Sequence, residues 1–140
     1  MAAEIQEIME GWVQSVRSKD AAAILSHVAP DVVMFDVVDP LRYQGANSVG
    51  KRMSEWLSSF EGRVDYENRD LNITAGGDVA FCHSLNRVRG TRKDGTKIEM
   101  WWRATVCFRK IAGKWMATHE HSSVPFDTGS GKASLHLKPE

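Results

Sequence analysis

The sequence predicts an α+β fold, with three helices near the N-terminus followed by a curved, mixed or antiparallel sheet. Apolar residues recur at helical spacing in much of the first 60 residues, and β-branched and aromatic runs fill residues 63–124. Glycine-containing turns separate these later runs. Helices that precede a meander of strands are typical of an α+β domain. We therefore expect three helices on the concave face of a cone-shaped sheet, whose open end forms a small-molecule pocket.

The helical half contains three predicted helices and one strand. The first helix runs from Ile5 to Val16, where apolar residues repeat every three or four positions. Asp20 is placed to cap a second, shorter helix over residues 21–28. The run VVMFDVV at residues 32–38 predicts a strand, and residues 45–60 predict a third helix with one apolar side.

The second half contains four predicted strands, which occupy residues 63–74, 79–89, 97–109 and 114–124. Turn signals at Gly76-Gly77, Lys93-Asp94-Gly95 and Ala112-Gly113 separate them. We assign residues 1–127 to one domain and residues 128–140, which are rich in Gly, Ser and Lys, to a C-terminal tail.

Composition limits the partners and the compartment. The formal net charge is zero, which argues against nucleic acid or an anionic membrane as the main partner. No apolar run approaches the roughly 20 residues that span a bilayer. The N-terminal segment is acidic and amphipathic, unlike a secretory signal, so we expect a cytoplasmic protein.

The two cysteines do not form a disulfide framework. If Asp94-Gly95 is a two-residue turn, Cys82 and Cys107 lie directly opposite on neighbouring strands. A disulfide between facing strand residues is usually strained, so we expect reduced thiols that fill space.

The segment from Trp101 to Val124 carries the first candidate functional residues. Arg103, His119, Glu120 and His121 are set among residues typical of half-buried strands. Charged groups inside a small domain are paired or line a cavity. Arg103 either clamps an oxygen of a ligand or forms an internal ion pair, and the histidines either transfer protons or hydrogen-bond to a carbonyl or carboxylate.

Asp36 is the second candidate, because it lies in a strand made otherwise of Val, Met and Phe. A partly desolvated carboxylate has a raised pKa suited to accepting and returning a proton. The alternative is a structural aspartate that contacts Arg103 or a backbone N–H group. An H-x-H pair at His119 and His121 without a third ligand is weak evidence for a metal, so we expect no metal site.

The order of elements, the RYQG segment before the third helix and the segment GKWMATHEHSSVPFD resemble the SnoaL-like group. That group belongs to the nuclear-transport-factor-2-like superfamily, together with ketosteroid isomerase. The resemblance covers roughly residues 5–127 and implies a cystatin-like α+β barrel. It places Asp36 at the general base of the isomerase, and Trp12 and Thr105 at its two oxyanion-hole donors. Both donors are changed here, which puts steroid isomerisation itself in doubt.

The sequence leaves two alternatives for which strand residues point into the cavity. If the placement of Thr105 holds, Trp101, Arg103 and Cys107 face the cavity with it, and Ser84 and Asn86 join them across the hairpin. The other face would then carry an apolar set that a second subunit covers, namely Phe81, Leu85, Trp102, Val106 and Phe108. If the facing is reversed, that set is the core under the helices. A one-residue β-bulge in the last strand would likewise change which of His119 and Glu120 faces the cavity.

The sequence thus predicts a homodimer, joined through the outer sheet face, that acts on a small apolar molecule containing a carbonyl. We expect a cofactor-independent isomerase or proton-transfer lyase in which Asp36, Arg103, His119 and His121 are catalytic. The expected substrate-binding residues are Trp12, Trp56, Asn86, Trp101, Thr105 and Glu120. The alternative function is a non-catalytic ligand-binding or oligomerisation module.

Overall fold

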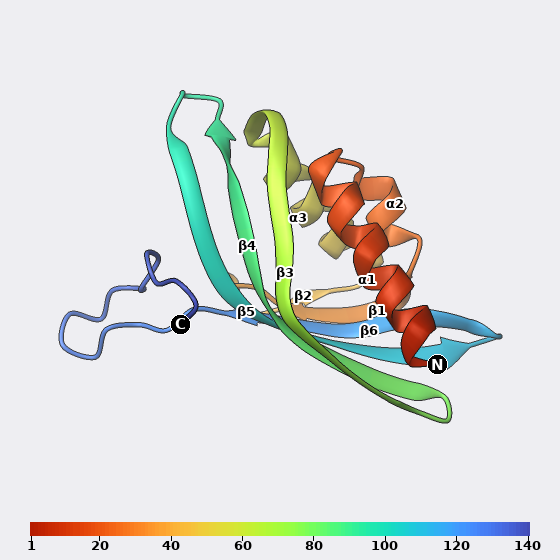
Figure 1. The fold of residues 1–140 in the computed structure, drawn as a ribbon. Helices are drawn as coiled ribbons and strands as arrows, with labels where there is room; N and C mark the ends of the chain where they lie inside the picture. The colour runs from red at the N-terminus through yellow and green to blue at the C-terminus, as the bar shows by residue number, and fades with distance from the viewer.

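The computed structural model describes residues 1–140 and has three helices against one face of a curved sheet (Figure 1). The helices are α1 (Ala2–Arg17), α2 (Ala21–Leu25) and α3 (Ala46–Ser58). The strands are β1 (Val28–Phe35), β2 (Tyr43–Gln44), β3 (Phe60–Gly76), β4 (Val79–Arg92), β5 (Lys97–Ile111) and β6 (Lys114–Ser123). The predicted α+β class is confirmed. None of the helices combines the length and the apolar character needed to cross a membrane.

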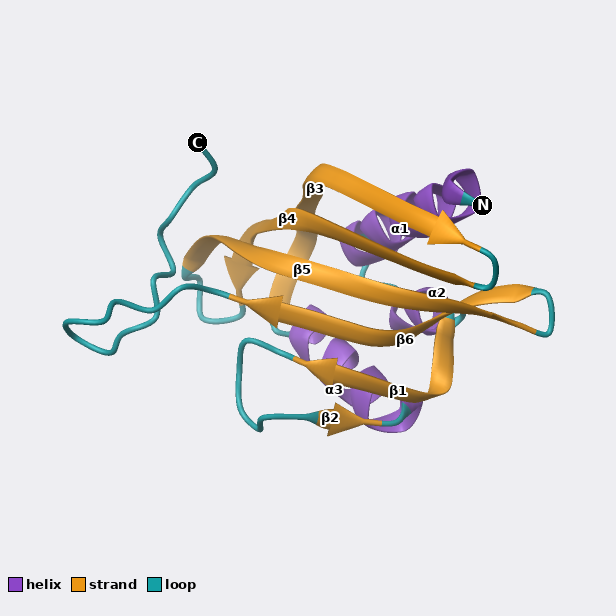
Figure 2. Ribbon diagram, turned by 90° about the horizontal axis from the view of Figure 1, so that it is seen from below, coloured by secondary structure: helices purple, strands orange, loops and turns teal.

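The six strands form one unclosed sheet in the order β2-β1-β6-β5-β4-β3 (Figure 2). Strands β1 and β6 pair in parallel, and every other neighbouring pair is antiparallel. The first strand of the chain therefore pairs with the last one. The C-terminal segment after β6 leaves the sheet and loops outward (Figure 1). Its last residues, 135–140, return to line hollows together with Trp101 and Arg103 of β5.

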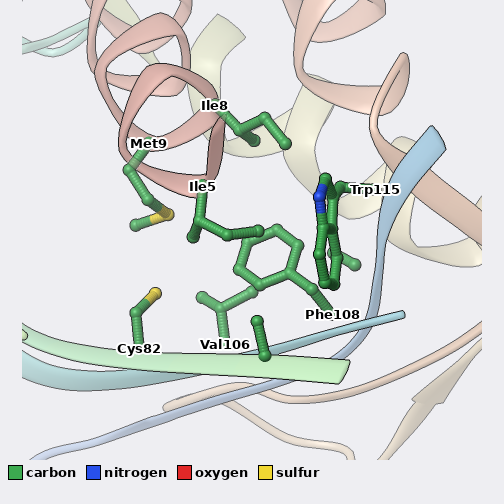
Figure 3. Close-up of a cluster of buried hydrophobic side chains, with 9 residues drawn as sticks. Ile5, Ile8, Met9, Cys82, Val106, Phe108 and Trp115 are labelled. Atoms are coloured by element: carbon green, nitrogen blue, oxygen red, sulfur yellow. The ribbon is translucent and has the colours of Figure 1, made fainter. Parts of the chain in front are cut away.

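The apolar stripe of α1 forms the largest part of the core. Ile5, Ile8 and Met9 pack on the concave faces of β4, β5 and β6, where Phe108 and Trp115 meet them (Figure 3). Full burial of a side chain of this size contributes about 1.5–3 kcal/mol. Asp20 caps α2 as predicted, because its carboxylate accepts a hydrogen bond from the Ala23 backbone N–H at 3.0 Å.

The turn between β4 and β5 is one residue longer than the two-residue turn on which the cysteine pairing was based. The Arg92 N–H donates to the Thr96 carbonyl at 2.8 Å, which leaves residues 93–95 as a three-residue loop with Gly95 at φ +87°. The register shifts by one residue, so Cys82 pairs with Val106. A shift of one residue exchanges the two faces of a strand.

A β-bulge at Thr118 exchanges the faces of β6. Phe108 pairs with Ala117 but the preceding Cys107 pairs with His119, so Thr118 is the extra residue. Before the bulge, Trp115 and Ala117 face the helices and are buried. After it, Glu120 does so, because it pairs with the buried residues Val106 and Met34.

Candidate active site

The only two polar residues that are fully buried, Ser84 and Asn86, lie on the concave face of β4. The Asn86 Oδ1 atom accepts hydrogen bonds from Ser84 Oγ and from Asn68 Nδ2, each at 2.7 Å. The Asn86 amide nitrogen consequently faces Tyr66 and donates to its hydroxyl oxygen at 3.1 Å. Ser84 and Asn86 thus face the interior, although Thr105, on whose placement that expectation depended, does not.

This hydrogen-bond chain leaves the hydroxyl hydrogen of Tyr66 without an acceptor. Tyr66 is buried on β3, and its hydroxyl oxygen already accepts from Asn86. No protein group accepts the hydroxyl hydrogen. Burial and the charge of Glu120 raise the pKa of Tyr66 above its usual value, so the hydroxyl stays protonated. Tyr66 therefore offers a hydrogen-bond donor whose direction is set by two asparagines.

Glu120 is the titratable group near this donor. Its pKa is raised to about 7, first by burial and second by the negative charge of Asp36. The side chain keeps partial access to water. A carboxyl group with this pKa exchanges its proton readily at neutral pH.

Asp36 follows the end of β1 and forms an ion pair with Arg52 of α3. Asp36 Oδ2 lies 2.8 Å from Arg52 Nε, and Oδ1 accepts the Val37 backbone N–H at 2.6 Å. Of the two structural alternatives expected for Asp36, the backbone hydrogen bond is present, but the ion pair is made with Arg52 and not with Arg103. Both carboxylate oxygens are occupied, so Asp36 acts on its surroundings mainly as a fixed negative charge.

Aromatic rings line the same side of the sheet. Trp56 of α3 makes edge-to-face contacts with Tyr66 and Trp102, at ring-centroid distances of 6.4 and 6.2 Å. Trp56 and Trp102 both keep part of their surface accessible to water. The arrangement suits a flat apolar molecule placed beside Tyr66 and Glu120.

Four β5 residues expected to face the cavity, among them Cys107, lie on the convex face instead. Arg103 and Thr105 are exposed, and Arg103 Nε donates to Ser123 Oγ at 3.1 Å. Trp101 lies beneath the Arg69 guanidinium at 4.8 Å. The cause is the longer β4–β5 turn, which turns the adjacent residues Trp102 and Ala104 toward the helices. The expected apolar set is divided between the two faces: Trp102, Val106 and Phe108 face the core, whereas Phe81 and Leu85 lie on the convex face.

The two candidate histidines also lie on the convex face, because of the bulge at Thr118. His119 Nδ1 donates to the Val33 carbonyl at 2.7 Å, as the structural alternative expected. Its ring and that of His121 pack edge-on against Phe35 at 4.8 and 5.3 Å. They are thus separated by the sheet from Glu120, which takes the inward position.

Trp12 faces the interior, but its contacts there are structural. Its indole N–H donates to the Ile24 carbonyl at 3.0 Å, and its ring stacks on Phe108 at 5.8 Å. The indole therefore holds α2 against α1 and has no free donor for a ligand. Among the predicted site residues, the concave cluster contains Asp36, Trp56, Asn86 and Glu120.

Arg52, Tyr66 and Asn68 were not anticipated as site residues. Arg52 lies three residues after Val49 and four before Trp56, which places all three on one helical face. Tyr66 and Asn68 alternate with exposed or half-buried residues of β3, and Asn68 pairs with Asn86 across the β3–β4 hairpin. These spacings are visible in the sequence once the register is known.

The main hollows of the surface do not open onto Tyr66, Asn86 or Glu120. The hollow that reaches this region has a volume of about 810 Å³ and is lined by Phe35, Asp36, His121 and the loop of residues 37–42.

Comparison with known proteins agrees with this fold. The family model of the SnoaL-like domain matches residues 5–127. An NTF2-like (nuclear-transport-factor-2-like) protein of unknown function from Pseudomonas putida is 34% identical, with a TM-score of 0.89 and coverage of 99% of this chain and 96% of that one.

Two more distant structures share the fold. A ketosteroid isomerase-like protein from Erwinia carotovora atroseptica is 18% identical, with a TM-score of 0.74 and coverage of 87% of this chain and 94% of that one. An NTF2-like superfamily protein from Salmonella enterica is 17% identical, with a TM-score of 0.79 and coverage of 95% and 96%. No curated protein matches the chain. The chain belongs to the SnoaL-like family and has the nuclear-transport-factor-2-like fold.

Proposed function

We propose that this protein binds a small, mostly apolar carbonyl compound on the concave side of the sheet and transfers a proton on it. The observation that carries the proposal is Glu120, whose pKa is raised to about 7. General acid–base catalysis is most effective when the pKa of the catalytic group lies near the working pH. Glu120 meets this condition, and Asp36 is less free to accept a proton because its two oxygens are held by Arg52 and a backbone N–H group.

The proposed step uses Tyr66 and Glu120 together. The Tyr66 hydroxyl donates its free hydrogen to the carbonyl oxygen of the ligand, which makes the adjacent C–H bond more acidic. The Glu120 carboxylate takes that proton, and the electron pair of the C–H bond enters an enolate. Return of the proton to another carbon completes an isomerisation, and departure of a β-leaving group completes a lyase reaction.

The aromatic residues supply the apolar part of the site. Trp56 and Trp102 present ring edges and faces beside Tyr66, and both residues are half-buried. Because no main hollow reaches Glu120, the ligand enters by displacing one of these rings. A planar molecule of one or two rings matches such a wall, whereas a sugar or a phosphate ester finds little to bind there.

The test is α-proton exchange on 2-tetralone in D₂O, followed by ¹H NMR. We expect enzyme-dependent loss of the α-proton signals at pH 7 and a reduction of at least about 100-fold in Glu120→Gln. Glu99→Gln, at an exposed residue of the convex face, is the matched control and should exchange like the unmodified chain. Exchange that is absent in the unmodified chain, or that survives Glu120→Gln unchanged, contradicts the proposal.

We also propose that a second copy of the chain covers the convex face. Val79, Phe81 and Ile111 are 58%, 46% and 45% exposed, although they are large and apolar. Contiguous apolar surface of this kind is typical of protein interfaces. Light scattering on a size-exclusion column should give twice the monomer mass, and Phe81→Lys should shift it toward the monomer. A chain that is monomeric at about 100 μM would exclude the dimer. A dimer without α-proton exchange activity would favour the non-catalytic alternative.

A further inference from the structure

A second hollow, separate from the Glu120 cluster, lies between α1, α2 and the β5–β6 turn. Its volume is about 470 Å³, which is within the range of sites for small ligands. One side is a straight stripe of α1 at helical spacing, which includes Glu7, Ile8, Gly11 and Trp12. The other side includes Trp115.

Gly11 is a glycine in the interior of α1 that the packing of the chain does not require. A Cβ atom built at this position meets no atom within 4 Å. Glycine is less favourable than alanine inside a helix. Because Gly11 lines the hollow, any side chain there would project toward it, and the glycine keeps this space free.

Trp115, one of the residues that line this hollow, carries a buried donor without a partner. The residue is 2% exposed, and its indole Nε1 makes no hydrogen bond. Figure 3 shows this nitrogen at the end of the ring nearest Ile8. A buried N–H group without an acceptor is costly and rare in native proteins. The indole of Trp12, by contrast, is satisfied by the Ile24 carbonyl.

The remaining polar groups of the hollow indicate the charge of a ligand. Lys114 Nζ donates to the Ser26 carbonyl at 2.8 Å, and His27 Nδ1 donates to the Trp115 carbonyl at 3.1 Å. Glu7 makes no ion pair. The hollow thus combines the apolar surfaces of Ile8, Trp12 and Trp115 with a mostly polar remaining lining. Of its two carboxylates, Glu4 is paired with the Met1 amino group and Glu7 is unpaired.

We propose that this hollow binds a small planar aromatic molecule that carries a hydrogen-bond acceptor in the ring and a protonated amine outside it. The ring lies over Gly11 between Ile8 and Trp12, the acceptor takes the Trp115 N–H, and the ammonium group approaches Glu7. The site does not depend on the proposed proton transfer, because it shares no residue with the Glu120 cluster.

The probe is 4-(aminomethyl)pyridine, which has a ring nitrogen acceptor and an ammonium group. The chain has five tryptophans, so the ¹H–¹⁵N spectrum contains five indole signals, and Trp115→Phe identifies the one that belongs to Trp115. We expect that signal to move downfield in a saturable titration, with a dissociation constant of about 1 mM for so small a ligand. Benzylamine lacks the acceptor and should bind about tenfold more weakly without the downfield shift.

Three variants locate the site. Gly11→Met should abolish the shift by filling the hollow, whereas Gly11→Ala should fold and still bind. Glu7→Gln should weaken 4-(aminomethyl)pyridine about tenfold and leave 4-methylpyridine, which lacks the ammonium group, unaffected. An unchanged Trp115 signal on the unmodified chain overturns the proposal, as does an equal response to benzylamine. The proposal is also overturned if the Trp115 indole N–H interacts only with an ordered water molecule.

Discussion

The raised pKa of Glu120 makes a quantitative prediction about stability and pH. The pKa is about 7 in the folded chain and 4.5 for an unperturbed group. The folded state therefore holds this proton more tightly than the unfolded state, and the stability it contributes is fully present below pH 4.5. That stability is lost as the pH rises through about 7.

The size of the loss follows from the two pKa values. A change from 4.5 to about 7 corresponds to about 3 kcal/mol, and partial contact with water reduces our expectation to about 2 kcal/mol. Glu120→Gln cannot ionise, so it should not lose this stability. We expect the difference in unfolding free energy between Glu120→Gln and the unmodified chain to rise by about 2 kcal/mol from pH 4.5 to pH 8.5.

Urea unfolding at pH 4.5, 5.5, 6.5, 7.5 and 8.5, followed by tryptophan fluorescence, measures this difference. Glu99→Gln, at an exposed position, should differ from the unmodified chain by the same amount at every pH. If the Glu120→Gln difference is also constant across the range, Glu120 has an ordinary pKa in the folded chain. The reasoning behind the proposed proton transfer would then be refuted.

Three further predictions follow from the concave face and the core. Asp36→Asn removes a negative charge near Glu120 and leaves the Arg52 guanidinium unpaired. The pKa of Glu120, measured by ¹³C NMR, should therefore be lower than in the unmodified chain. Gly90→Ala places a Cβ atom 2.9 Å from a fully buried phenylalanine ring, and urea unfolding should report a loss of about 1–3 kcal/mol. Cys107 should react with iodoacetamide much faster than Cys82, which is 1% exposed and has its pKa raised to about 12.

Each of these three predictions has its own control. An unchanged pKa of Glu120 in Asp36→Asn would mean that burial alone raises it. Gly76→Ala, where a Cβ atom meets nothing within 4 Å, should lose little stability, and an equal loss in both alanine variants would reject the close contact. Equal labelling rates for the two thiols would contradict the assigned faces of β4 and β5.

The sequence predicted where the helices and strands lie better than it predicted which way the strand side chains point. Periodicity located the three helices and five of the six strands to within a few residues, because burial of one side imposes it directly. The two-residue strand β2 was missed, since its segment was expected to be a loop. The direction of each β5 side chain depends instead on whether the β4–β5 loop has two or three residues. The segment around Asp94-Gly95 is compatible with both, and this single residue moved Arg103 and Thr105 to the convex face.

The bulge at Thr118 had a similar effect on β6. Nothing in the local sequence distinguishes a regular strand from a bulged one at this point, and the choice between His119 and Glu120 depends on it. Tertiary packing decides between them, because the bulge lets Trp115 and Glu120 face the same side although their positions differ by an odd number, five. The ion pair of Asp36 with Arg52 joins a strand end to a helix and likewise requires the three-dimensional arrangement.

The parallel pairing of β1 with β6 constrains how the chain is made. Val33 pairs with His119, so β1 has no partner on that side until the ribosome has released nearly the whole domain. We expect nascent chains that end before residue 114 to leave β1 with an open edge able to pair with other chains. Completion of the domain is thus tied to its last strand, and a premature stop there should yield an aggregating product.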